Sequence, residues 1–475
     1  MSAVGLKTLD GNEWSIPDAE LDGLRAGLRG PLYLPGDPGY DAGRKVWNGM
    51  IDRRPAAIVR AAGAADVIRA VGFARDHNLL IAVRSGGHNI AGNAVADGGL
   101  MLDLSALKSV RVDVETRAAR VEPGVTLAEF DREAQAFGLA TPLGINSTTG
   151  IAGFTLGGGF GWISRKHGLT VDNLLSADVV TADGELRHAS ARENPDLFWA
   201  IRGGGGNFGV ATSFEYRLHP VGPQVIAGLI VHPLARAREV LDGYRRFVAT
   251  APDEVTAWAV LRKAPPLPFL PAEFHGKEVL VLAVCAIGDP GTAEKAVAPL
   301  RALGKPIADI IGPMPFAAWQ SIFDPLLTPG ARNYWKSHSF HKLDDGLIEV
   351  ALDATRSLPT DESEIFIVHL GGAVNRVPVD ATAYPHRDID FVVNIHARWR
   401  APEQDAALIA WARRMFDAAA PFATGGVYVN FMPGDEGMRV KSGAYGHNFE
   451  RLAKLKAAYD GGNLFRVNQN IEPAA

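Results

Sequence analysis

Cysteine is almost absent from this chain of 475 residues, which contains only Cys285. A single cysteine excludes an internal disulfide and a cysteine-rich metal site. Cys285 lies in the apolar run 279–286, which is typical of a buried strand. We therefore expect the chemistry of this protein to depend on groups other than thiols, and we expect a cytoplasmic protein.

The sequence also lacks long apolar runs and an excess of charge of one sign. No segment has the length and apolarity to span a bilayer, and residues 1–18 show no export signal. Lysine and arginine number 48 against 53 aspartates and glutamates, a net charge of −5. This balance gives no general attraction to nucleic acid or to an anionic membrane. We predict neither as a partner, and the length predicts two domains.

Glycine is abundant, with 52 residues, many of them in the segments 86–99, 144–161 and 203–209. Glycine costs backbone entropy, so such clusters indicate backbone that packs closely against a ligand. In the segment 144–161, seven of eighteen residues are glycine. This density favours a backbone lying flat against a large planar ligand. The segment 203–209 adds a third glycine-rich turn, between a predicted helix and a predicted strand.

The first cluster follows a predicted strand at 79–83 and reads Arg-Ser-Gly-Gly-His-Asn over residues 84–89. Successive small residues allow several backbone N–H groups to converge into an anion-binding nest, which suits a diphosphate. The spacing is neither that of a Rossmann turn nor that of a P-loop. The alternative interpretation is a tight turn in which His88 is incidental.

These motifs resemble the vanillyl-alcohol oxidase superfamily, and more closely its berberine bridge enzyme-like branch. The resemblance continues in the segment 196–209, which reads Asp-Leu-x-Trp-x-x-Arg-Gly-Gly-Gly-x-Asn-Phe-Gly, and in the C-terminal pattern over 445–471. It covers residues from about 45 to 471. The ordered series of motifs makes coincidence implausible.

The resemblance implies an α+β fold with a two-part FAD-binding domain and an inserted substrate domain. Residues 1–217 would form the first part of the FAD domain and residues 425–475 would return to it. Residues 218–424 would form the substrate domain, built on an antiparallel sheet flanked by helices.

The resemblance also implies FAD bound covalently through His88 to the C8α methyl of its ring system. No metal is predicted. The residues expected to bind the cofactor are His88, Arg84, Ser85, Gly86, Gly87, Asn89, Asn146, Thr148, Thr149, Gly150, Gly153, Gly158, Gly159, Gly209, Val210 and Asn468.

The chain departs from the family at the second attachment point. Many members also attach FAD through a cysteine in a Gly-x-Cys-x-Thr-x-Gly loop, and here Asn146 stands at the cysteine position. Cys285 falls in the other predicted domain. We therefore expect one covalent bond, through His88 only.

The catalytic strand departs as well. Phe431 replaces a tyrosine that acts as a base in relatives, and Val392 stands where some relatives carry a glutamate base. The remaining candidates for a catalytic role are Tyr428, Lys336 and Asn394. A lysine in a dry pocket has a lowered pKa and can act as a base. The alternatives are a solvated or ion-paired Lys336 and a Tyr428 that is hydrogen-bonded in the core.

Trp335, Phe431 and Tyr334 are the candidates for the wall of a flat, apolar substrate pocket, or else ordinary core residues. His338 and His341 lack an evident third metal ligand. Together these features predict an FAD-dependent oxidoreductase acting on a C–H bond next to oxygen or nitrogen of a small molecule. Molecular oxygen is the expected acceptor, giving hydrogen peroxide. The alternatives are a tailoring oxidase of a secondary-metabolite scaffold and a flavin-carrying protein with little turnover. The sequence leaves the oligomeric state open.

Overall fold

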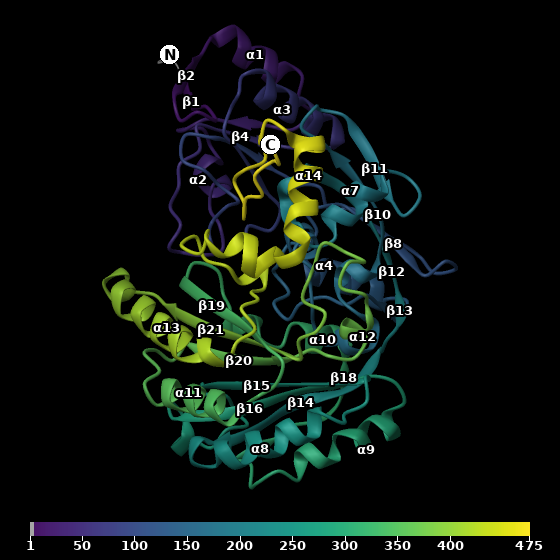
Figure 1. The fold of residues 1–475 in the computed structure, drawn as a ribbon, viewed down its shortest axis with the longest axis vertical. Coiled ribbons are helices and arrows are strands. Elements are labelled where there is room, and N and C mark those ends of the chain that lie inside the picture. Colours follow the sequence, from purple (N-terminus) through teal and green to yellow (C-terminus); the bar gives the residue numbers. More distant parts are fainter. Residues whose placement is uncertain (1–3) are drawn as a thin grey trace.

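The computed structural model describes residues 4–475 and consists of two parts, one above the other in Figure 1. The upper part contains the N-terminal half and the C-terminal helix α14 (Phe449–Asp460). The lower part is a large sheet with helices on its far side. The chain thus crosses from the upper part to the lower part and back, and the predicted α+β class is confirmed.

The upper part contains two principal sheets. The first has the order β3 (Leu32–Tyr33), β4 (Ala57–Arg60), β6 (Leu100–Asp103), β5 (Ile81–Arg84), with β4, β6 and β5 parallel. The second is antiparallel, in the order β11 (Leu186–Ser190), β10 (Leu174–Val180), β12 (Val210–Arg217), β8 (Ala118–Val121), β7 (Val110–Asp113). Two short pairs complete the strands: β1 (Val4–Lys7) with β2 (Glu13–Ile16), and β9 (Leu139–Ala140) with β13 (His219–Pro220).

The lower part is built on one antiparallel sheet of eight strands. Its order is β17 (Ala308–Asp309), β14 (Gln224–Pro233), β16 (Glu278–Ala286), β15 (Val255–Lys263), β20 (Glu364–His369), β21 (Phe391–Trp399), β19 (Arg332–Phe340), and β18 (Gly312–Pro315) also pairs with β14.

The helices of the upper part are α1 (Asp18–Ala26), α2 (Tyr40–Gly43), α3 (Ala64–Asp76), α4 (Leu127–Gln135), α5 (Ile151–Leu156), α6 (Ser164–His167), α7 (Pro195–Ile201) and α14. The insertion adds α8 (Ala237–Val248), α9 (Pro290–Arg301), α10 (Phe316–Gln320), α11 (Asp345–Arg356), α12 (Ala373–Arg376) and α13 (Asp405–Ala419). Across residues 4–475, none of these helices has the length and apolarity needed to cross a membrane.

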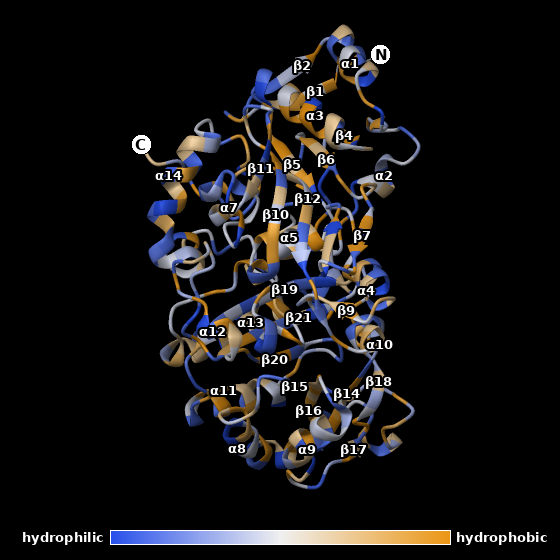
Figure 2. Cartoon of the chain, turned by 90° about the vertical axis from the view of Figure 1, so that its right-hand side faces the viewer, coloured by the Kyte–Doolittle hydropathy of each residue, from blue (hydrophilic) through white to orange (hydrophobic). Residues whose placement is uncertain are grey.

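The large sheet is buried on both faces because its strands alternate between two apolar cores. In β15, Ala257 and Ala259 face the core shared with α8, α9, α11 and α13. Trp258 and Val260 face the opposite core, toward the upper part. Figure 2 shows hydrophobic residues along the strands of the upper part too, for example β5, β10 and β12. The face of the large sheet that carries Trp258 is therefore the one that meets the glycine-rich segments.

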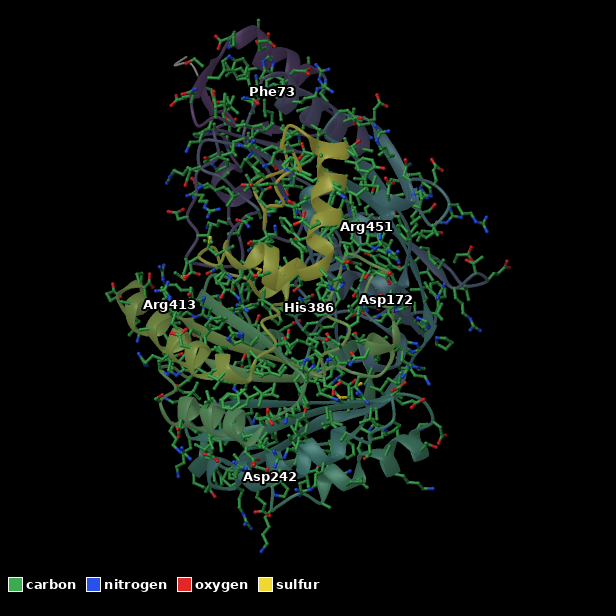
Figure 3. The ribbon with its side chains drawn as sticks, viewed as in Figure 1. Phe73, Asp172, Asp242, His386, Arg413 and Arg451 are labelled. Carbon is green, nitrogen blue, oxygen red and sulfur yellow. The ribbon has the colours of Figure 1, made fainter. Side chains whose placement is uncertain are left out.

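The two parts are joined by hydrogen bonds and a buried ion pair. The Asn48 side-chain amide donates to the carbonyls of Ile90 and Asn333, each at 3.0 Å, and so links a loop of the upper part to β19. Arg387 pairs with Asp172 at 2.7 Å, at the junction visible in Figure 3. These contacts hold the cavity between the parts in a defined shape.

Candidate active site

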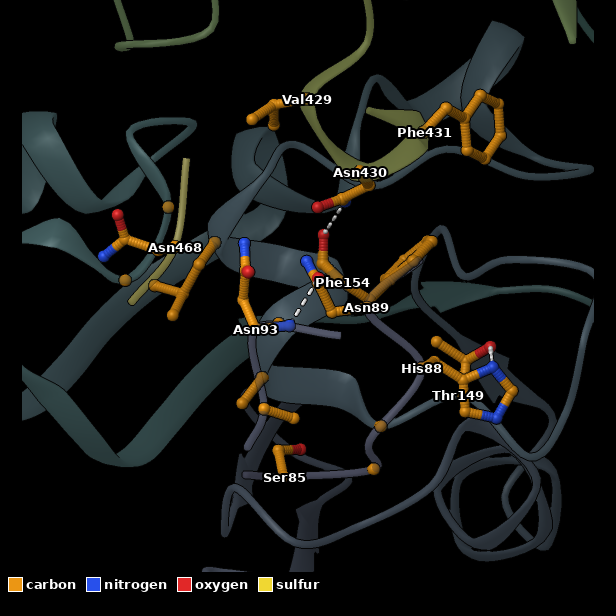
Figure 4. Close-up of a pocket in the computed structure, with 18 of the residues that line it drawn as sticks. Ser85, His88, Asn89, Asn93, Thr149, Phe154, Val429, Asn430, Phe431 and Asn468 are labelled. Atoms are coloured by element: carbon orange, nitrogen blue, oxygen red, sulfur yellow. Dashed lines mark hydrogen bonds between the residues drawn. The ribbon is translucent and has the colours of Figure 1, made fainter. Parts of the chain in front are cut away.

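A cavity lies between the two parts, and all three glycine-rich segments contribute to its wall. Its volume is about 320 Å³, within the range of roughly 300–1,000 Å³ of ligand sites. Figure 4 shows Asn468 and His88 on opposite sides of it, with Asn89 and Phe154 between them. The predicted site residues that line it are Ser85, Gly86, Gly87, His88, Asn89, Asn146, Thr149, Gly150, Gly153, Gly209, Val210, Trp335, Asn394, Tyr428, Phe431 and Asn468.

Two of the glycine segments touch each other directly. A Cβ atom on Gly86 would lie 2.3 Å from the backbone nitrogen of Gly150, and a Cβ on Gly150 would lie 2.3 Å from the nitrogen of Gly86. Gly87 adopts a φ of +71°, in the left-handed region that favours glycine. These glycines therefore bring the loop after β5 and the loop before α5 into backbone contact.

Other glycines leave free space at the cavity wall. A Cβ on Gly153 or on Gly206 would meet no atom within 4 Å, although both residues line the cavity. The Asn468 side-chain oxygen is buried and has no hydrogen-bond partner among the described residues. The wall thus offers open space and an unpaired polar atom, as expected of a binding site for a ligand.

His88 is held between an indole ring and two threonines. Its ring stacks on Trp47 with a centroid distance of 5.0 Å and an interplanar angle of 22°. Thr148 Oγ1 lies 3.0 Å from His88 Nε2, and Thr149 Oγ1 lies 3.4 Å from Nδ1. Burial lowers the pKa of His88 to about 3, against the opposing effect of a hydrogen bond with the Thr148 backbone. The imidazole is therefore neutral at physiological pH and keeps a nucleophilic lone pair.

Four predicted cofactor residues do not line the cavity. Arg84 turns away and donates to the carbonyl of Gly43. Thr148 is exposed and contacts the site through His88 and Asn146. Gly158 packs against the Tyr384 ring, which a Cβ would approach to 2.9 Å, and the Gly159 N–H donates to the Tyr428 hydroxyl at 3.0 Å. In this structure the four residues lie behind the cavity wall, in contact with residues of the wall or of neighbouring loops, and their role in binding the cofactor stays a prediction.

Three predicted site residues, Tyr334, Trp335 and Lys336, are consecutive in β19, and their side chains alternate between the two sides of the strand. Trp335 lines the cavity. Its neighbours Tyr334 and Lys336 point to the opposite side of the strand, as the period of two requires. The Tyr334 hydroxyl donates to Asp435 at 2.8 Å, and Lys336 forms a buried ion pair with Glu436. Neither the predicted pocket role of Tyr334 nor the predicted catalytic role of Lys336 agrees with this geometry.

Tyr428 lines the cavity with its hydroxyl already engaged. The hydroxyl oxygen accepts from the Gly159 N–H at 3.0 Å and from the Asn430 amide at 2.9 Å. Burial raises the pKa of Tyr428 to about 12. The phenol therefore stays protonated at physiological pH and is not a base in this state.

Asn394 contributes an unpaired amide oxygen to the cavity wall. It lies in β21 and is 4% exposed, and its side-chain oxygen is buried with no hydrogen-bond partner within residues 4–475. His396, two residues further along the same face, also lines the cavity and escaped the sequence analysis. Its Nδ1 lies 3.2 Å from Glu364 Oε1 and its Nε2 lies 3.1 Å from Asn333 Oδ1. Both nitrogens of His396 are thus occupied, whereas the amide oxygen of Asn394 is free.

The residues that complete the aromatic wall were not predicted from the sequence. Trp47, Phe160, Trp258 and Phe366 line the cavity together with Trp335 and Phe431. Trp47 comes from a loop without a recognisable motif, and Trp258 and Phe366 occur in apolar runs that give no sign of which face is buried against a ligand. Phe160 lies within the glycine segment 144–161, whose spacing indicates the ligand but not the role of this ring. The spacing of two in β21 was the one available signal, since it places His396 on the face of Asn394.

His338 of β19 and His341, just after that strand, each contact a backbone carbonyl. His338 Nε2 contacts the carbonyl of Phe416 at 3.1 Å, and His341 Nδ1 contacts the carbonyl of Asp388 at 2.8 Å. No group of three His, Cys, Asp or Glu residues suitable for a metal occurs among the described residues.

Comparison with known proteins gives a consistent result. Residues 55–190 match a family described as FAD binding domain, and residues 427–472 match one described as berberine and berberine like. The (R)-6-hydroxynicotine oxidase of Paenarthrobacter nicotinovorans is 31% identical over 94% of this chain and 97% of its own length. The xylooligosaccharide oxidase of Thermothelomyces thermophilus is 29% identical over 90% of this chain and 89% of its own.

Solved structures agree with these sequence matches. The 6-hydroxy-D-nicotine oxidase of Arthrobacter nicotinovorans superimposes with a TM-score of 0.83 at 29% identity, covering 94% of this chain and 98% of that one. Fold and site therefore define an FAD-dependent oxidoreductase of the vanillyl-alcohol oxidase type. Within that class, this chain belongs to the berberine bridge enzyme-like family of FAD-linked oxidases. Gly153 and Gly206 leave open space at the cavity wall, and the side-chain oxygen of Asn468 has no partner in the part of the chain that the structure describes. Both features fit this cofactor.

Proposed function

We propose that this protein is an oxidase that removes hydride from a C–H bond next to nitrogen or oxygen of a small, flat, apolar molecule. Molecular oxygen is the final acceptor and hydrogen peroxide is the product. FAD, when bound, supplies the hydride acceptor. The observation that carries the proposal is the cavity in which His88 and the glycine segments meet an aromatic wall and one free amide oxygen.

The proposal includes a single covalent bond between His88 and FAD. The imidazole is neutral and lines the cavity, as a nucleophile must. Asn146 offers no thiol, and Cys285 is buried within β16. The net reaction forms an N–C bond and breaks one methyl C–H bond of the cofactor and the N–H bond of the imidazole. Molecular oxygen takes up the two protons and two electrons as hydrogen peroxide.

The cavity wall determines which substrates fit. Its substrate side is lined by large aromatic rings, and Asn394 provides the free amide oxygen. Each hydroxyl of a sugar requires a hydrogen-bond partner when it is buried. An aromatic wall with few free polar groups therefore favours a flat apolar substrate anchored by one polar contact at Asn394.

The shortage of a side-chain base favours an amine over an alcohol. Phe431 has no titratable group, Val392 is fully buried, and Tyr428 is protonated. Oxidation of an alcohol requires removal of the O–H proton together with hydride loss. A neutral amine forms an iminium ion without losing a proton, so the residues present suffice for it.

Anaerobic reduction of the purified holoenzyme tests the proposal. We expect flat secondary or tertiary amines to bleach the flavin absorbance in a stopped-flow instrument faster than matched alcohols or sugars do. Admission of oxygen should then restore the absorbance and release hydrogen peroxide. Bleaching by sugars alone would contradict the substrate class. Failure of the whole panel would instead favour a flavin-carrying protein with little turnover.

A further inference from the structure

Asn146, at the position of the second attachment residue in relatives, contacts His88 through one intermediate side chain. Thr148 Oγ1 lies 2.8 Å from Asn146 Oδ1 and 3.0 Å from His88 Nε2. The backbone nitrogen of Thr148 lies 3.2 Å from the same Asn146 oxygen. The three residues therefore form one hydrogen-bonded chain that ends at the imidazole.

The direction of each hydrogen bond in this chain follows from the chemistry of its members. A backbone N–H only donates, so the Asn146 atom that faces Thr148 is the amide oxygen rather than the nitrogen. An amide oxygen only accepts, so the Thr148 hydroxyl must donate its single hydrogen to it. The hydroxyl oxygen then accepts the hydrogen bond from His88, and Nε2 carries the proton.

This assignment leaves the lone pair of the neutral imidazole on Nδ1, because a neutral ring has one N–H. The Thr149 hydroxyl, 3.4 Å from Nδ1, is consistent with a donor to that lone pair. In the opposite tautomer the Thr148 hydroxyl would donate to Nε2. Its oxygen lone pairs would then face the Asn146 oxygen across 2.8 Å without a hydrogen between them.

We propose that Asn146 and Thr148 are positioning residues that hold His88 in the Nε2–H tautomer, so that Nδ1 is the atom that bonds to FAD. This inference rests on the covalent attachment proposed above. Thr148 is exposed, so the Nε2 proton that leaves when the bond forms departs next to solvent. The asparagine that replaces the second attachment residue thus directs the first attachment.

The linkage isomer in the wild-type holoenzyme is the first test, and it requires no variant. Protease digestion yields the flavin-bearing peptide, and its NMR spectrum identifies which imidazole nitrogen carries the cofactor. We expect Nδ1. Attachment through Nε2 would overturn the proposal.

The second test compares Thr148→Val with Thr148→Ser. The full-length variants are purified from riboflavin-limited cells and incubated with FAD, and covalent incorporation is followed by in-gel fluorescence and intact mass. Because Thr148→Val loses one neutral hydrogen bond, we expect its covalent incorporation of FAD to be about fivefold slower. Thr148→Ser keeps the hydroxyl and should match the wild type. Equal rates in the two variants, with equal melting temperatures, would refute the relay.

His88→Ala separates failure of this inference from failure of the proposed attachment. We expect this variant to carry no covalent flavin while the wild type carries one equivalent. A wild type without covalent flavin, or an adduct that survives in His88→Ala, would reject the attachment and the relay together. Attachment at His88 with the wrong nitrogen would reject the relay alone.

Discussion

Lys336 and Trp335 are consecutive residues with unrelated environments. Trp335 borders the cavity, whereas the ammonium group of Lys336 pairs with Glu436 and lies 4.4 Å from the centre of the Phe416 ring. Arg439 reaches the same carboxylate at 3.2 Å. At the scale of the residue, these neighbours make Lys336 a structural cation that joins β19 to the C-terminal segment.

Lys336→Met should therefore lower stability and leave catalysis unchanged. Glu436 keeps Arg439 as a partner when Lys336 is removed. We therefore expect a cost of about 1–3 kcal/mol, for the loss of one charged hydrogen bond to a buried carboxylate. We expect this loss in urea unfolding and an unaltered rate of flavin reduction.

The matched control for that variant is Lys342→Met, since the Lys342 side chain is 77% exposed. Its stability should change by less than about 0.5 kcal/mol. A Lys336→Met protein with wild-type stability and much slower flavin reduction would restore the lysine to a catalytic role.

At the scale of the element, helices α4 and α10 meet through a buried carboxyl group. The Gln320 amide of α10 donates to Asp131 of α4 at 3.1 Å. The second oxygen of Asp131 and the amide oxygen of Gln320 are buried without partners in the described chain. Burial raises the pKa of Asp131 to about 7. A protonated Asp131 can donate to the Gln320 oxygen and satisfy both.

Asp131 should make stability fall as the pH rises. Its folded pKa lies above the unfolded value, so the folded protein binds the proton more tightly. The contribution is complete below pH of about 4 and is lost as the pH approaches 7. Asp131→Asn should remove this slope and raise stability at pH 8 by up to about 4 kcal/mol. Urea unfolding at pH 5 and pH 8 measures both effects.

Glu133→Gln, an exposed change on the same helix, is the control and should leave the slope intact. An Asp131→Asn protein less stable than the wild type at pH 8 would show that the carboxylate is ionised and stabilising.

The sequence allowed prediction of the cofactor side of the site better than of the substrate side. The loop at His88 and the glycine segments are local signals, since small residues at fixed spacing report on backbone contact. The sequence did not indicate which side of the strand Trp335 and Lys336 face. The large sheet is buried on both faces, so its strands show no polar alternation. Arg84 was misplaced for a related reason: the position of a long side chain depends on a partner, Gly43, that is distant in sequence.

At the scale of the whole molecule, the C-terminal segment closes the cofactor side of the cavity. Lys456 of α14 is fully buried and pairs with Asp460. It also donates to the carbonyls of Asn207 at 2.8 Å and Phe465 at 3.0 Å, and both of these residues line the cavity. One ammonium group therefore joins the third glycine segment to the tail.

Lys456→Met should weaken cofactor binding as well as folding. We expect a stability loss of about 3–5 kcal/mol from the unpaired Asp460. In a His88→Ala background, where FAD is held without a covalent bond, we also expect a higher dissociation constant for FAD by fluorescence titration. Lys454→Met, an exposed change on the same helix, is the control. Unchanged FAD affinity in the Lys456 variant would show that the tail does not shape the cofactor site.

The segment Trp47–Gly49 has a consequence for how ligands enter and leave. Besides the bonds of Asn48, the Gly49 N–H donates to the Ala331 carbonyl at 2.8 Å and the Gly330 N–H donates to the Trp47 carbonyl at 3.0 Å. The residue stacked on His88 is thus fastened to the opposite half of the molecule. A hinge opening of the two parts would break all of these bonds at once. Passage of substrate and product should therefore depend on side-chain fluctuations at a fixed entrance. Solvent viscosity should then slow ligand association only through its effect on diffusion of the ligand.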